Sequence, residues 1–145
     1  LPWLSGTSAG PPLQRASRQV GMLAALVTGV SVFIAAALYV RIDLLTRLIV
    51  SGSPDGYLDP IRLMLLGSVP YVAYVVLRNP LDALAGFPHN SINVSVSLGI
   101  GVIAIWTLPS YTGAVTGMTI GLVTLGLLSL RAWRVETLHI RTIGL

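Results

Sequence analysis

Residues 20–40 read VGMLAALVTGVSVFIAAALYV, a run of 21 residues without a charged side chain. As an α-helix this run would be about 31 Å long, which matches the hydrocarbon core of a bilayer. A run of this length and composition is typical of a membrane-spanning helix.

The rest of the chain has the same character. Of its 145 residues, 54% are hydrophobic and only 10% are charged, whereas an average soluble domain carries about 25% charged residues. A core of this size cannot hide so much apolar surface from water. The composition therefore excludes an ordinary soluble domain and a disordered chain. Because there is no cysteine, it also excludes a disulfide scaffold.

Three further spans follow from where the charges fall. Residues 63–77 form an apolar run of about 22 Å between Arg62 and Arg78, whose long side chains can reach outward and extend it. From 87 to 130 there is no charged residue, and Pro109 divides this stretch in two. We therefore expect an all-α integral membrane protein with four transmembrane helices, at about 20–40, 61–78, 92–108 and 113–130.

Local signals predict where these helices begin. Asp59 followed by Pro60 has the pattern of an N-cap and first helical residue. Asn90 or Ser91 can cap the third helix, and Ser110 can cap the fourth.

The segment 41–50 mixes apolar residues with Arg41, Asp43 and Arg47. It either extends the first helix or lies along the membrane interface, and we favour an interfacial segment. Asp43 and Arg47 are one helical turn apart and are able to pair.

The arginines predict the orientation. With four spans, residues 1–19 (a cytoplasmic tail or the end of a preceding helix), the second loop and the basic tail 131–145 share one side. That side holds six of the nine basic residues: Arg15, Arg18, Arg78, Arg131, Arg134 and Arg141. The positive-inside rule then places both termini in the cytoplasm, in a multi-pass protein of the cell (plasma or inner) membrane. Trp133 is expected in the aromatic belt of the inner interface. Because the basic residues are spread over segment ends, no nucleic acid is expected as a partner.

Gly113, Gly117 and Gly121 form two overlapping G-x-x-x-G units on one face of the fourth span. A ridge without side chains lets another helix come close. We favour packing against a neighbouring helix of the same bundle, and the alternative is a seam between two copies of the chain.

Tyr71, Tyr74 and Arg78 lie at i, i+3 and i+7, on one stripe that follows Pro70. They either line a polar cavity, where the arginine would suit a phosphate or carboxylate, or serve packing and headgroup anchoring, which we favour. Asp82 lies four residues after Arg78, so the two form either a latch or a solvated surface pair.

Bond-making chemistry is not expected. His89 and His139 have no second ligand at helical spacing, so neither a metal nor another cofactor is predicted. The few acidic residues lie in loops and match no catalytic triad, so we do not expect an enzyme.

The stretch LMLLGSVPYVAYVVLRNPLDA at 63–83, followed by HNSIN at 89–93, resembles a C-terminal helix and the following loop of polysaccharide flippases. These form the O-antigen-transporter-like branch of the multidrug/oligosaccharidyl-lipid/polysaccharide superfamily. LPWLS at 1–5 and the segment 44–57 also resemble parts of that family.

The resemblance implies the C-terminal part of a transporter that exports polysaccharide or lipid-linked oligosaccharide by alternating access. It implies Arg78 and Asp82 at a cytoplasmic gate, with Tyr71 and Tyr74 toward a cavity. Family members are larger, so the implied partners are the remaining helices of the transporter, the lipid bilayer and a lipid-linked oligosaccharide. The alternative is a stand-alone four-helix membrane subunit or scaffold that associates through the face of Gly113, Gly117 and Gly121.

Overall fold

The computed structural model describes residues 11–49, 55–84, 87–108 and 110–143, and within these ranges it contains helices and no strand. The helices are α1 (Pro11–Val40), α2 (Ile42–Ile49), α3 (Asp55–Leu84), α4 (His89–Thr107) and α5 (Tyr111–Ile143). The all-α prediction is confirmed.

Four of these helices are long and apolar enough to cross a membrane, which confirms the predicted four-span fold. The segments are Arg15–Val40, Gly56–Leu84, His89–Thr107 and Tyr111–Ile140. Helices of this length and composition indicate a membrane-embedded protein.

The helices extend beyond the apolar runs that predict them. α5 continues to Ile143, through the segment expected to be a basic tail. Residues 131–143 contain neither proline nor glycine, so nothing in the sequence breaks the helix there.

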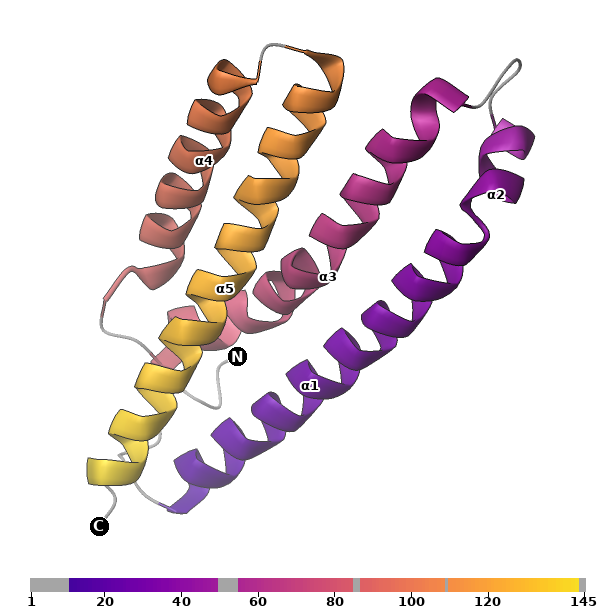
Figure 1. Cartoon of the computed structure of the whole chain (residues 1–145). Coiled ribbons are helices and arrows are strands. Elements are labelled where there is room, and N and C mark those ends of the chain that lie inside the picture. Colours follow the sequence, from indigo (N-terminus) through magenta and orange to yellow (C-terminus); the bar gives the residue numbers. More distant parts are fainter. Residues whose placement is uncertain (1–10, 50–54, 85–86, 109, 144–145) are drawn as a thin grey trace.

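The helices alternate in direction, and α5 lies between α3 and α4, with α1 packed along α3 (Figure 1). One end of the bundle holds the start of α1, the end of α3, the start of α4 and the end of α5. It lies at the bottom of Figure 1, and we call it the lower end. α2 and the start of α3 lie at the other end, together with the α4–α5 connection.

The start of α3 differs from the prediction. α3 begins at Asp55 and contains Pro60, Pro70 and Pro80, so the prediction of Asp59 as N-cap is wrong. Pro60 lacks the N–H that would bond the Gly56 carbonyl one turn earlier. Gly56 is exposed in the first turn of the helix, where water can take the place of that bond.

Pro70 lies where α3 meets α5. A Cβ atom added to Gly126 would collide with the backbone of Pro70 and lie 2.5 Å from its Cβ. Glycine at 126 therefore lets α5 follow the proline-containing part of α3 at backbone distance. Nearby, the Thr119 hydroxyl donates a hydrogen bond across the interface to the Leu63 carbonyl at 3.2 Å.

The buried core lies in the lower half of the bundle, between α1, α3 and α5. It consists of Ala24, Leu77, Leu81, Ala132 and Trp133. Trp133 is only 8% exposed, so its predicted place in an aromatic belt is wrong. Because α5 stays helical beyond the apolar run, its indole turns toward α1, where Gly21 leaves room for it.

Candidate functional site

The glycine face of α5 is covered by α4 of the same chain. A Cβ atom added to Gly117 would lie 2.8 Å from the backbone nitrogen of Ile105 and 3.0 Å from the carbonyl oxygen of Gly101. One added to Gly121 would lie 3.2 Å from the carbonyl oxygen of Ser97, and one added to Gly113 would collide with Leu108. A second copy could reach this face only if α4 moved away from it.

The α4–α5 connection supports one of the predicted caps. Ser110 precedes the first residue of α5, and its Oγ accepts a hydrogen bond from the Gly113 N–H at 2.9 Å. This is the geometry of an N-cap, as predicted. Pro109, the predicted divider of the two spans, lies outside the described residues.

The two tyrosines of the predicted stripe lie together on α3. Their ring centroids are 5.9 Å apart. Tyr74 is buried, whereas Tyr71 is exposed on the bundle surface, and so is Arg78 one turn after Tyr74. The stripe therefore has a buried and an open part.

Asn90 joins the start of α4 to the end of α3. Its Nδ2 donates to the carbonyl oxygen of Arg78 at 2.7 Å and to Oδ1 of Asp82 at 2.6 Å. No ion pair links Arg78 to Asp82 in the described part of the chain. The prediction of Asn90 as a cap is wrong, because its side chain turns toward α3 and Pro88 precedes the helix without a side-chain cap bond.

A second polar contact joins the start of α4 to the lower end of α5. His89 Nε2 and Glu136 Oε1 are 2.9 Å apart, in a partly buried position with the Phe87 ring 5.1 Å from the imidazole. Sequence spacing predicts no partner for His89, because Glu136 is 47 residues away in the segment expected to be a tail. One signal was present: Glu136 is the single acidic residue after Asp82.

We call Arg78, Asp82, His89, Asn90 and Glu136 the lower polar junction. It combines an exposed cation, two carboxylates and an imidazole at the point where α3, α4 and α5 meet. Three hydrogen bonds hold the start of α4, two from Asn90 to α3 and one between His89 and Glu136 of α5. Together these contacts can fix α4 against α3 and α5, or release it when they break.

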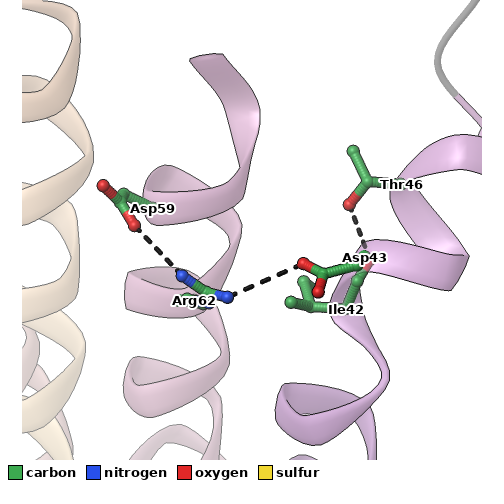
Figure 2. A network of polar contacts seen from close by, with 5 residues as sticks. All are labelled: Ile42, Asp43, Thr46, Asp59 and Arg62. Atoms are coloured by element: carbon green, nitrogen blue, oxygen red, sulfur yellow. Dashed lines mark hydrogen bonds and ion pairs between the residues drawn. The ribbon is translucent and has the colours of Figure 1, made fainter. Parts of the chain in front are cut away.

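The other end of the bundle is linked by Arg62. Figure 2 shows its guanidinium between Asp59 and Asp43. The ion pairs are 3.4 Å to Asp59 and 3.6 Å to Asp43. The guanidinium also lies 5.6 Å from the ring centroid of Tyr39. Asp43 therefore pairs with α3 and not with Arg47 of its own helix. Both aspartates are largely exposed, so each ion pair contributes little stability.

The segment 41–50 forms a helix of its own, α2, after a turn at Arg41. Ile42 and Thr46 are buried, whereas Leu44 and Leu48 are exposed one turn apart. α2 therefore has a buried side and an exposed apolar side, which is typical of a short helix at a membrane interface.

The described residues include no cluster of three His, Cys, Asp or Glu side chains that could hold a metal ion. Comparison with known proteins gives no family: no family model, no curated protein and no solved structure matches this chain.

Proposed function

We propose that the chain is the C-terminal part of a membrane transporter that exports polysaccharide or lipid-linked oligosaccharide by alternating access. Two lines of support meet at one place. The stretch 63–83 that resembles polysaccharide flippases ends in Arg78 and Asp82. The observation that carries the proposal is that the same end of α3 is held to α4 by Asn90.

In this proposal the lower polar junction is the gate. The bond from Asn90 to the Asp82 carboxylate is short and involves a charged acceptor, which makes it stronger than a neutral hydrogen bond. The contact between His89 and Glu136 holds the same helix end to α5. One state of the transport cycle keeps both contacts, and the other state separates α4 from its neighbours.

The substrate path runs along the stripe of α3. The exposed guanidinium of Arg78 matches a phosphate in charge and in its forked geometry, as the carrier of a lipid-linked oligosaccharide would require. Tyr71 and Tyr74 follow deeper along the same helix and supply hydroxyl groups for a polar ligand. The activity involves no bond-making step, and the remaining helices of the transporter complete the path.

We also propose that the protein lies in the plasma or inner membrane with both termini in the cytoplasm. Six of the nine arginines favour this orientation. α1 begins and α5 ends at the same end of the bundle, as this orientation requires.

The test is export of a lipid-linked oligosaccharide in proteoliposomes that contain the full-length transporter. Arg78→Ala and Tyr74→Ala should each lower the export rate, by roughly tenfold for the arginine if it contributes one charged hydrogen bond. Arg41→Ala is the matched control, because Arg41 is also exposed but lies at the opposite end. Full export by both α3 variants at normal expression would refute these roles.

A further inference from the structure

One face of α4 carries a row of buried polar side chains. Asn90, Asn93 and Ser97 are 6%, 7% and 3% exposed, and they follow one another at i, i+3 and i+7. Residues at this spacing lie on the same side of a helix. The row therefore faces the interior of the bundle along two turns of α4.

Each of these side chains holds a polar atom without a protein partner. Asn90 Oδ1, Asn93 Nδ2 and Ser97 Oγ are fully buried and form no hydrogen bond to any described residue. They comprise one acceptor, one donor and one hydroxyl that can do both.

Ser97 differs from the other buried helical hydroxyls. The hydroxyls of Thr46 and Ser129 each donate to the carbonyl one turn earlier, both at 2.8 Å. Ser97 has a carbonyl at the same place in its own helix but does not bond to it. Its hydroxyl is therefore left without a partner in the α4 backbone.

The row reaches well into the span. At 1.5 Å per residue, Asn93 lies about 6 Å and Ser97 about 12 Å from the start of α4. Polar groups at such depth are costly when they lack partners, because the bilayer core supplies none. The lower end of the row is hydrophilic, since Asn90 binds Asp82 and His89 precedes it.

The row of polar side chains ends at Ser97. Gly101 lies one turn beyond it, and a Cβ atom added there would come within 3.3 Å of the Gly117 carbonyl oxygen and 3.6 Å of the Gly121 Cα, so the backbones of α4 and α5 meet closely. The groove that continues between the two helices is apolar and is lined by residues such as Val102, Ile105 and Val115, which offer water no hydrogen bond.

We propose that a water-filled crevice enters the bundle at the lower polar junction and ends at Ser97. Water is the ligand that fits, because it both donates and accepts and can therefore serve all three unpartnered atoms. The crevice would carry water about 12 Å along α4. This inference concerns hydration alone and stands whether or not the protein transports a glycan.

Single cysteines can test the crevice, because the 145-residue chain has none of its own. Ser97→Cys and Asn93→Cys place a thiol in the row. Leu98→Cys is the matched control at the same depth, since Leu98 is 64% exposed on the outer surface of the bundle. Each variant is reconstituted in liposomes and given a charged methanethiosulfonate reagent on both sides of the membrane, and a neutral maleimide in parallel.

A thiol reacts as the thiolate, which forms in water and not in lipid. We expect the charged reagent to label Asn93→Cys fastest, and Ser97→Cys at least about tenfold faster than Leu98→Cys. The proposal is overturned if both row cysteines react with the charged reagent no faster than Leu98→Cys. It is equally overturned if they react with the neutral maleimide alone. Should Ser97→Cys fail to fold, the rate for Asn93→Cys decides.

Discussion

Replacing Gly117 by alanine tests the packing of α4 on α5. The added Cβ atom would lie 2.8 Å from the Ile105 nitrogen and 3.0 Å from the Gly101 carbonyl oxygen. Both are backbone atoms, so no side chain can rotate away and α4 itself has to shift. Overpacking of this kind costs about 1–3 kcal/mol.

The same substitution also brings a gain, because alanine favours a helix over glycine by about 1 kcal/mol. Gly99 isolates this gain: it lies in α4, and a Cβ atom there meets nothing within 4 Å. We therefore expect Gly99→Ala to keep or raise the free energy of unfolding. Gly117→Ala should fall below it by about 1–3 kcal/mol.

The assay is equilibrium unfolding of the two purified variants in mixed micelles with increasing SDS, followed by loss of helicity. Gly126→Ala, which would collide with the Pro70 backbone, should be destabilised at least as much as Gly117→Ala. If Gly117→Ala and Gly99→Ala unfolded at the same SDS fraction, the close approach of α4 and α5 would be refuted.

Three further predictions use the same unfolding assay. Asn90→Ala removes the hydrogen bonds to the Arg78 carbonyl and the Asp82 carboxylate and should lower the free energy of unfolding by about 1.5–3 kcal/mol. The control is Ser91→Ala at the exposed neighbouring residue, which should change it by less than about 0.5 kcal/mol. Equal effects of the two substitutions would contradict these bonds. A double-mutant cycle of His89→Ala and Glu136→Ala should give a coupling of at least about 0.5 kcal/mol, and strict additivity would mean that the two side chains do not interact. Ile42→Ala should cost about 2–5 kcal/mol because Ile42 is 3% exposed, while Asp43→Ala, which removes the ion pair between α2 and α3, should cost less than about 1 kcal/mol; the reverse order would show that α2 is held by charge and not by packing.

The fold was largely predictable because charge marks the ends of membrane helices. The charge-free run 20–40, the fence of Arg62 and Arg78, and the gap in charge from 87 to 130 with Pro109 in it were enough to predict four spans. The exact ends were not, since they depend on whether a helix can continue outside the bilayer. α5 continues past Arg131, where no proline or glycine interrupts it. α3 begins before Pro60, because a single lost hydrogen bond in an exposed first turn does not stop a helix.

The lower polar junction was predictable only in part. Arg78 and Asp82 stood out because they are charged residues beside an apolar run, but the partner of Asp82 is Asn90 on the next helix. The contact between His89 and Glu136 spans 47 residues, and no spacing within one helix can reveal it. The burial of Asn93 and Ser97 could not be predicted from their residue types, because only the packed bundle shows which side of α4 is buried.

The central claim is a membrane-embedded bundle of four spans, and its topology is the most direct test. Cysteines at Arg18, Tyr57, Ser110 and Arg134 are made one at a time in the full chain expressed in cells, and an impermeant maleimide is added before or after the membrane is permeabilised. The account predicts that Tyr57→Cys and Ser110→Cys react in intact cells, whereas Arg18→Cys and Arg134→Cys react only after permeabilisation. Labelling of Arg18→Cys and Arg134→Cys from opposite sides of the membrane would contradict it.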